Sequence, residues 1–426
     1  MSSFSTYNLS DRSNELLKLL HLYRGMTAKQ LAKFVFNVKE LSTSQEKSIY
    51  NYLSALRKRN LVTSYRSTNQ LRGSSIFYLS QWGYNYTLDL LDIGLGQSND
   101  GWLPAGTEES SSSEFSYELY TPPLKQLDHH LQLIDFFISI HIFEEENYFS
   151  YEVKHRNNLY AAKKFKVDGK VSRYRPDAEI LLNGNLFTIE IDRGTESHEQ
   201  LCAKFETYKK YLELQQDKEC LRGIIFVVES KVRNHGVRRR WENILGAFLK
   251  VLYKFKKNIK LILTTSDSIE ETLLHELNRE NYYNRLQYFV DQWNVEYEEI
   301  KQLKLGNGTK SNFFIGQSGN KAQLYFAGIS GCFDSTFLVE YLSNCNLIPK
   351  IEETLRMKGL KSSGVSVIVF TPSSQHPHIP LNLDTFNLNK TITVPLAKIS
   401  ETIEYSCIET YLKIPDHFYK EDVFYE

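Results

Sequence analysis

The sequence lacks several features that would assign it to a protein class at once. Its five cysteines are scattered with no C-x-x-C spacing, so neither a structural zinc site nor a disulfide framework is expected. No stretch approaches the length of a membrane span, and the N-terminus lacks the basic start and apolar run of a secretory signal. These absences predict a cytoplasmic protein with no membrane partner.

An excess of charge of one sign is also missing, because 51 Lys and Arg residues balance 51 Asp and Glu residues. Any binding to nucleic acid must therefore use local basic patches. No glycine-rich loop follows an expected strand, which argues against a nucleotide-binding protein. The chain has 426 residues, 41% of them hydrophobic and 24% charged, which is enough for two or three globular domains.

Composition divides the chain into four segments. Residues 1–92 are expected to form a winged helix domain, and residues 93–123, rich in Gly, Ser, Glu and Pro, a linker. Residues 124–293 follow the order α-β-β-β-α-β, and residues 294–426 are expected to form a C-terminal α/β extension without a recognisable motif. The predicted fold class is α/β, with a mixed sheet flanked by helices after the winged helix.

The N-terminal segment has the element order of a winged helix. Helices are expected over 14–23, 28–34 and 45–59, followed by strands over 61–65 and 76–79 around a basic loop. In such domains the third helix enters the major groove of double-stranded DNA while polar side chains hold phosphates. The candidate DNA contacts are Lys47, Asn51, Arg57, Lys58, Arg59, Arg66 and Arg72. The alternative is a protein-interaction module with a solvated basic face.

The most informative stretch lies between residues 175 and 193. The Asn-Gly-Asn run at 183–185 predicts a hairpin turn between two apolar strands. Because side chains alternate along a strand, Glu190 and Asp192 share one face, with Asp177 across the hairpin. Three carboxylates near one point are suitable ligands for Mg²⁺ or Mn²⁺ and for phosphodiester chemistry. The alternative is a solvated polar sheet face.

A basic run over residues 231–240 lies where a buried strand is expected to end and a helix to begin. Helix N-termini attract phosphate, so Arg238, Arg239 and Arg240 are candidates for gripping the DNA backbone. The alternative is a solvated helix start whose basic side chains pair with nearby acids.

The order α-β-β-β-α-β, with acids on the second and third strands, resembles the restriction-endonuclease-like PD-(D/E)xK core. The resemblance implies that Asp177 and Glu190 hold Mg²⁺ and that a lysine follows two residues after the glutamate. Asp192 occupies that position instead, and Lys204 on the next helix is the candidate to replace the lysine. The catalytic candidates are therefore Asp177, Glu190, Asp192 and Lys204, and an inactive DNA-binding relic is the alternative.

A longer resemblance covers residues 13–255. The winged helix, the run from Leu127 to Asp135, Arg175-Pro176-Asp177, the run from Glu190 to Ser197, and Lys204-x-x-x-Tyr208 are similar to the replication-relaxation family. This family comes from plasmids and conjugative elements of Gram-positive bacteria. The resemblance implies a role in plasmid replication and DNA relaxation, with other replication or relaxation proteins as partners.

The same resemblance implies four further functional positions, which are His129, Arg193, Glu196 and Tyr208. The residues themselves leave rival roles open. His129 lies among Leu and Phe and suits a hydrogen-bonded core histidine. Residues 192–195 suit the cap of the following helix, with Glu196 in its first turn.

Two functions remain open from the sequence. The first is a replication and relaxation factor whose winged helix finds a DNA site and whose nuclease-like domain engages or nicks the DNA. The second is a non-enzymatic regulator or initiator whose α/β domain serves homodimerisation. The missing lysine favours the second function, and the third acid, Asp192, favours the first.

Overall fold

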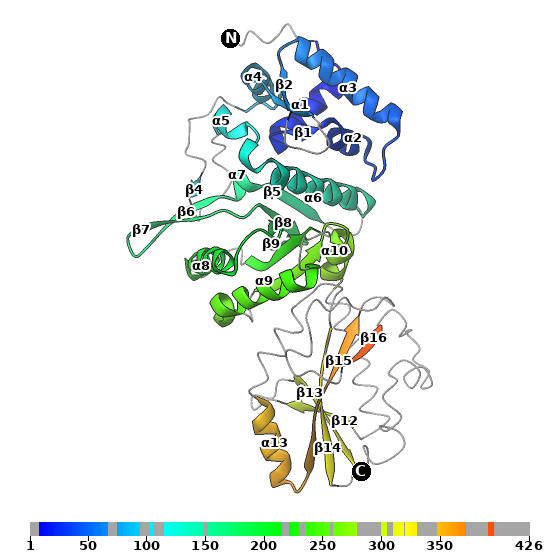
Figure 1. The fold of residues 1–426 in the computed structure, drawn as a ribbon, viewed down its shortest axis with the longest axis vertical. Helices are drawn as coiled ribbons and strands as arrows, with labels where there is room; N and C mark the ends of the chain where they lie inside the picture. Colours follow the sequence, from blue (N-terminus) through cyan, green and yellow to red (C-terminus); the bar gives the residue numbers. More distant parts are fainter. Residues whose placement is uncertain are drawn as a thin grey trace. The chain divides into compact units, whose positions relative to one another are not determined.

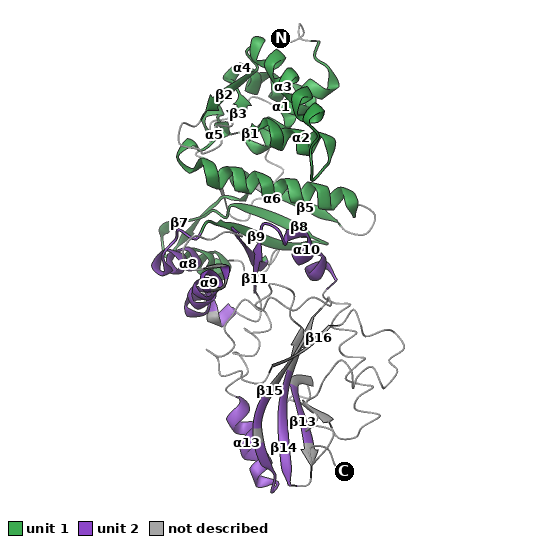
Figure 2. Cartoon of the chain, turned by 45° about the vertical axis from the view of Figure 1, so that its right-hand side comes forward, with its two compact units in different colours: residues 1–193, 206–221 green, residues 194–205, 222–426 purple. Residues whose placement is uncertain are grey.

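The computed structural model describes residues 8–66, 75–93, 102–104, 115–147, 152–214, 221–229, 236–255, 259–278, 300–304, 310–318, 320–329, 347–371 and 391–395. Helices and strands alternate through these segments, which confirms the mixed α/β class (Figure 1). The chain divides into two compact units, residues 1–193 with 206–221 and residues 194–205 with 222–426 (Figure 2). The domain boundaries at residues 92, 123 and 293 stay predictions.

The first unit begins with the elements of a winged helix. They are α1 (Asp11–Tyr23), β1 (Met26–Thr27), α2 (Ala28–Phe36), α3 (Thr43–Lys58), β2 (Val62–Arg66), β3 (Ser75–Leu79) and α4 (Gln81–Leu90). The strands form one antiparallel sheet in the order β1-β3-β2. Capping boxes formed by Thr27 with Gln30 and by Ser42 with Gln45 bond the free N–H groups where α2 and α3 begin. Arg72, in the expected wing loop, lies outside the described residues.

Part of the segment expected to be a linker has regular structure. Its elements are β4 (Leu103–Pro104) and α5 (Tyr117–Tyr120), and η1 (Leu124–Gln126) follows. Phe115 and Tyr120 are buried, and the Tyr84 hydroxyl donates to the Phe115 carbonyl at 2.5 Å. The Ser- and Glu-rich composition of the segment hides these aromatic anchors.

The first unit continues with a second group of elements. They are α6 (Leu127–Glu146), β5 (Val153–Asn157), α7 (Asn158–Ala161), β6 (Lys163–Val167), β7 (Lys170–Tyr174), β8 (Ala178–Leu182), β9 (Asn185–Asp192) and the second half of α8 (His198–Leu214). Within this unit β9, β8 and β5 pair antiparallel in that order. Strands β4, β6 and β7 form a separate three-stranded sheet. The β6–β7 hairpin is absent from the element order that the sequence predicts.

The second unit contains two groups of strands. The first group is the parallel pair β10 (Leu221–Val228) and β11 (Lys260–Thr265), with α9 (Gly236–Leu252), η2 (Tyr253–Phe255) and α10 (Ile269–Leu277). The second is a mixed sheet of β12 (Ile300–Lys304), β13 (Lys310–Ser318), β14 (Lys321–Ile329), β15 (Lys361–Thr371) and β16 (Thr391–Pro395), in that order, with α13 (Ile348–Met357). In the described segments no helix is long and apolar enough to cross a membrane.

Hydrogen bonds of two buried side chains, Gln30 and His130, join the winged helix to α6. The Gln30 side chain donates to the Leu131 carbonyl and to Asp135 Oδ1, both at 2.9 Å. His130 Nε2 lies 2.9 Å from the Gly25 carbonyl, which can only accept, so the ring nitrogen donates. Because buried polar groups are costly without partners, these paired contacts hold the two parts in one arrangement.

A second histidine, His155, joins the winged helix to β5. Tyr23 Oη lies 2.8 Å from His155 Nε2. The ring of Tyr23 packs on Phe34 at 4.8 Å and on Phe137 at 5.2 Å between centroids. Burial lowers the pKa of His155 to about 4, and the nearby His141 lowers it further in the same direction. Burial likewise lowers the pKa of His130 to about 4.

We predict that acid destabilises the first unit through these two histidines. Between pH 6.5 and 4 each imidazole takes up a proton in the unfolded chain and stays neutral in the folded chain, so the free energy of unfolding falls by about 1.4 kcal/mol per pH unit for each. Urea denaturation at pH 7 and pH 5 measures this slope. His155→Gln should reduce this slope of the free energy of unfolding against pH, because it removes one of the two titrating imidazoles and leaves the other ionisable groups in place. Equal slopes in the two proteins would contradict the prediction.

Candidate functional site

The candidate site is built on the hairpin of β8 and β9. Asn183 and Gly184 form its two-residue turn, with left-handed φ values of 46° and 76°. Turns with both central residues in this region match the twist of antiparallel strands. The turn pairs Leu182 with Asn185 and fixes the register along the hairpin.

This register gathers acidic side chains on one face of the hairpin. Glu179 lies directly across from Thr188, and Glu190 and Asp192 follow Thr188 on the same face by alternation. Glu179 and Glu190 are each 2% exposed, and Asp192 is 3% exposed. The alternative of a solvated polar face is therefore wrong. Since a buried carboxylate is costly without a partner, each acid needs donors or an opposite charge.

Glu179 is a member of this group that the sequence analysis misses. Its partner is Arg156, the residue directly across from it on β5, with Nη1 and Oε2 3.6 Å apart. The stretch 178–182 resembles a plain apolar strand, which hides the acid. The alternation from Asp177 to Glu179 is the pattern that would have found it.

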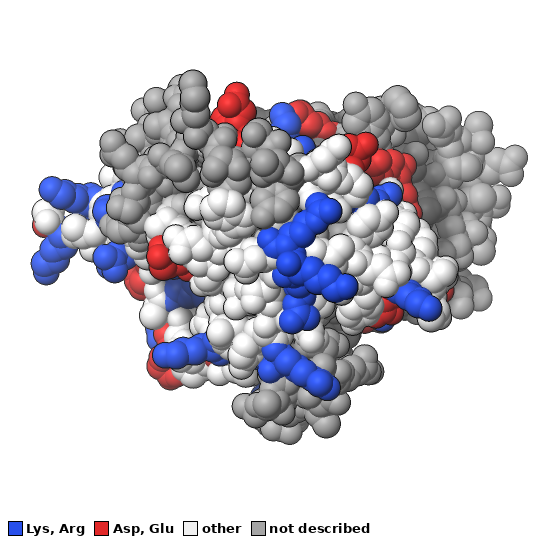
Figure 3. Space-filling model, turned by 90° about the horizontal axis from the view of Figure 1, so that it is seen from above, with Lys and Arg blue, Asp and Glu red and all other residues white. Residues whose placement is uncertain are grey.

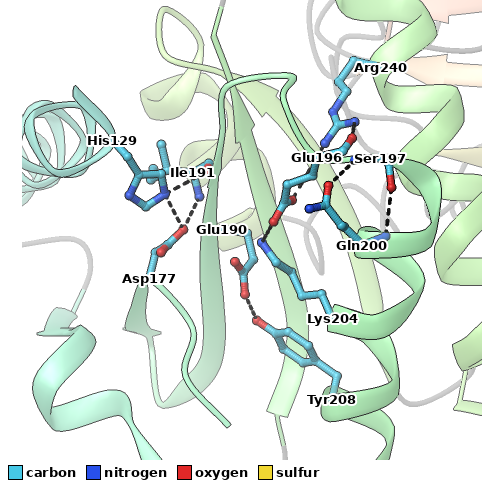
Figure 4. Close-up of polar contacts among 10 residues, drawn as sticks. All are labelled: His129, Asp177, Glu190, Ile191, Glu196, Ser197, Gln200, Lys204, Tyr208 and Arg240. Carbon is cyan, nitrogen blue, oxygen red and sulfur yellow. Dashed lines mark hydrogen bonds and ion pairs between the residues drawn. The ribbon is translucent and has the colours of Figure 1, made fainter. Parts of the chain in front are cut away.

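Glu190 is bonded by a tyrosine from α8. The Tyr208 hydroxyl donates to Glu190 Oε1 at 2.5 Å (Figure 4). The same hydroxyl lies 3.2 Å from Thr188 Oγ1. Burial, followed by the charge of Glu190, holds the pKa of Tyr208 well above its usual range. The phenol therefore stays protonated and remains a donor to the carboxylate.

A second buried phenol lies against the same acids. The ring of Tyr174 meets Tyr208 edge-on at 5.1 Å and stacks on Tyr211 at 4.1 Å. Burial raises the pKa of Tyr174 well above its usual range, and the charges of Glu179 and Glu190 act in the same direction. Two neutral phenols thus line the acidic face.

Asp177 is tied to α6 and β9 where β8 begins. Its Oδ2 accepts from the Ile191 backbone N–H at 2.8 Å and lies 3.1 Å from His129 Nε2 (Figure 4). His129 Nε2 is also 3.1 Å from the Ile191 carbonyl. Because both neighbours are acceptors, this ring nitrogen carries a hydrogen. His129 is hydrogen-bonded and 29% exposed in its side chain, whereas the adjacent His130 is the buried core histidine.

The predicted metal ligands are Asp177, Glu190 and Asp192. Within the described segments, no group of three or more His, Cys, Asp or Glu side chains is arranged to hold a metal ion. Asp177 Oδ2 is bonded to the Ile191 N–H and Glu190 Oε1 to Tyr208. Each carboxylate keeps further lone pairs beside these hydrogen bonds, so the bonds alone do not exclude a shared ion. A Mg²⁺ or Mn²⁺ site at these residues stays a prediction.

In the second unit, Glu196 meets two basic side chains. Lys204 Nζ lies 3.0 Å from Glu196 Oε1. Arg240 donates to the Glu196 carbonyl at 2.6 Å, and its Nη2 lies 3.8 Å from Glu196 Oε2 (Figure 4). Arg240 is 6% exposed, which corrects the expectation that it grips DNA. Arg239 is exposed, and the side chain of Arg238 lies outside the described part of the chain. A catalytic role for Lys204 stays a prediction.

The start of α8 is capped by residues other than those expected. The Ser197 N–H donates to Gln200 Oε1 at 2.7 Å, and the Gln200 N–H donates to Ser197 Oγ at 3.3 Å, which is a capping box. Because α8 begins after Ser197, Glu196 lies outside its first turn. In the first unit, Arg193 pairs instead with Asp128 of α6, with Nη2 and Oδ2 3.3 Å apart.

The winged helix presents a second candidate surface. Ile49, Leu53 and Leu56 bury one side of α3. The predicted DNA contacts of the winged helix that lie within the described residues are all exposed, namely Lys47, Asn51, Arg57, Lys58, Arg59 and Arg66. Seen from above, Lys and Arg side chains gather in a band across the middle of the molecule (Figure 3). This arrangement suits a phosphate backbone.

Fold and site together define a winged helix protein with a mixed α/β region that buries acidic side chains. Residues 17–228 match the model of the replication-relaxation family, and the chain belongs to this family. Among curated proteins, none matches it.

Two solved structures show slight similarity. A mutant of ZitR from Lactococcus lactis is 17% identical, with 22% of this chain and 57% of that chain covered and a TM-score of 0.17. Protein VC1899 from Vibrio cholerae is 12% identical, with 63% of this chain and 57% of that chain covered and a TM-score of 0.26. This chain thus spans 57% of each. Both TM-scores are too low to support a conclusion about this chain.

We predict that Tyr208→Phe lowers the free energy of unfolding by about 1 to 3 kcal/mol, because a buried carboxylate loses its donor. Chemical denaturation at pH 7 measures the loss. In a Glu190→Gln background the same change should cost less, since the charged acceptor is gone. Additive effects of the two substitutions would show that the hydrogen bond has no stabilising role.

Proposed function

We propose that this chain binds double-stranded DNA through its winged helix during replication or relaxation of a plasmid or related mobile element. The observation that carries the proposal is the division of α3 into two sides. Three apolar residues bury one side, while the exposed side carries basic and amide groups. Membership of the replication-relaxation family supports the same role.

The residues of α3 divide into two kinds of DNA contact. Lys47, Asn51 and Lys58 follow one another at helical spacing along the exposed side. An asparagine amide can bond both polar groups of an adenine edge, so Asn51 suits base recognition. Arg57 and Lys58 stand in the last turn of α3, beside exposed Arg59, and suit phosphate contacts.

We predict that Arg57→Gln combined with Lys58→Gln weakens binding to every duplex and lowers the salt dependence of log K by about 2, because each phosphate contact contributes about 0.9. Asn51→Ala should instead reduce discrimination between sequences. Fluorescence anisotropy over a salt series distinguishes these effects. Lys18→Gln, on the exposed side of α1, is the matched control. Unchanged salt dependence in the double variant would contradict a DNA-binding role for α3.

A second candidate function is metal-dependent nicking of DNA by the acidic face of β8 and β9. The observation that favours it is the burial of Glu179, Glu190 and Asp192 on that face. Acidic groups removed from water are a common feature of functional sites, and structural ion-pair networks also contain them. The alternative is a non-enzymatic regulator or initiator in which the α/β region serves homodimerisation and the acids are structural.

Nicking is tested with supercoiled plasmid that carries the element's own origin, in Mg²⁺, Mn²⁺ or EDTA. If the acids act, the wild type should nick only with metal, and both Asp177→Asn and Glu190→Gln should lower the rate at least about a hundredfold. DNA binding by each variant is the control for folding. Binding without nicking in the wild type would favour the regulator.

A further inference from the structure

The β6–β7 hairpin belongs neither to the winged helix nor to the acidic face of β8 and β9, and its features need a separate explanation. Its strands are joined by Asp168 and Gly169, both with left-handed φ (50° and 77°). It forms a sheet with β4 in the order β4-β6-β7, so β7 is an edge strand. Val171, near the turn, is 57% exposed.

The hairpin concentrates positive charge, although the net charge of the whole chain is zero. Between Lys163 and Arg175 there are six basic residues, and Asp168 in the turn is the only acid. Lys166, Lys170, Arg173 and Arg175 are exposed. A hairpin that only needed solubility would serve equally well with both signs of charge. Solubility therefore does not explain why six of the charged residues in this segment are basic.

The two faces of the hairpin differ in what they contact. On one face Phe165 and Tyr174 are buried, and their rings pack on Tyr211 of α8 at 5.8 Å and 4.1 Å between centroids. The opposite face carries Lys164 directly across from Arg173, by the register of the two strands. Like charges that face each other across two strands destabilise the pair. A polyanion bound to this face would relieve that repulsion.

Edge-strand protection is the simplest rival explanation, because charged residues on an exposed edge prevent pairing with another chain. It accounts for basic residues on β7. It does not account for Lys164 on β6, since β4 pairs with β6 at that residue.

Arginines at the base of the hairpin surround an aromatic ring. The guanidinium of Arg175 lies 4.0 Å from the centroid of Trp102, and that of Arg173 lies 5.2 Å from it. Burial and the nearby Arg173 both lower the pKa of Arg175. Contacts of this kind hold guanidinium groups in place and reduce the entropy lost when they bind phosphate.

We propose that the outward face of the β6–β7 hairpin binds the phosphate backbone of double-stranded DNA without regard to sequence, as a contact additional to the winged helix. Antiparallel two-stranded ribbons fit the grooves of duplex DNA, and Lys and Arg side chains along them reach the phosphates. The inference rests on the proposed function, since it takes the ligand to be DNA.

The test uses the full chain with Lys164→Gln, Lys166→Gln and Arg173→Gln combined, three residues on the outward face. The matched control combines Lys350→Gln, Arg356→Gln and Lys358→Gln, three exposed basic residues at α13. Affinity for a duplex of random sequence is measured by fluorescence anisotropy over a salt series. The hairpin variant should bind at least about tenfold more weakly at low salt, with the salt dependence of log K lower by about 2.7. The control should match the wild type, and thermal unfolding should show all three proteins folded.

The outcomes separate the two proposals. If the wild type binds DNA and the hairpin variant matches it in affinity and salt dependence, the hairpin inference is wrong and the winged helix proposal stands. If the wild type binds no duplex at any salt concentration, the proposed function fails and the hairpin inference fails with it. If the substitutions reduce binding to vesicles of anionic lipid and leave DNA binding unchanged, the hairpin inference is also overturned.

Discussion

The register of the β8–β9 hairpin is the constraint on which the acidic face depends. Because side chains alternate along a strand, a slip of one residue would send Glu179 to the opposite side from Thr188. Asn183 and Gly184 prevent the slip, because their left-handed backbone forms a turn of two residues. A longer loop, which would change the register, is not needed. A substitution in this turn would therefore act on the acids without touching them.

The acids remain buried because specific neighbours offset the cost of burial. Glu190 accepts from Tyr208, and Glu179 lies across from Arg156. An apolar group of similar size would stabilise such a position as well or better in most proteins. Buried charge held in this way limits the ways in which the region can pack, so the acids whose burial costs stability also define one arrangement.

Local sequence patterns predict those elements whose cause is local. The helices of the winged helix follow from their caps and apolar spacing, and the β8–β9 hairpin follows from its turn residues. Contacts between distant residues escape such patterns. Arg240 donates to the carbonyl of Glu196, which is 44 residues away in the sequence. Only the fold shows this contact, which holds the Arg240 side chain in a buried position. The β6–β7 hairpin escapes because basic residues interrupt the alternation that marks a strand.

Two neighbouring residues of α6 contact different parts of the first unit. His130 bonds the Gly25 carbonyl in the winged helix, and His129 lies against Asp177 where the acidic hairpin begins. A helix bends little over so short a length, so α6 holds its contacts with the winged helix and with the β8–β9 hairpin at a fixed spacing. One helix thereby connects the winged helix with the start of the hairpin that carries the acids.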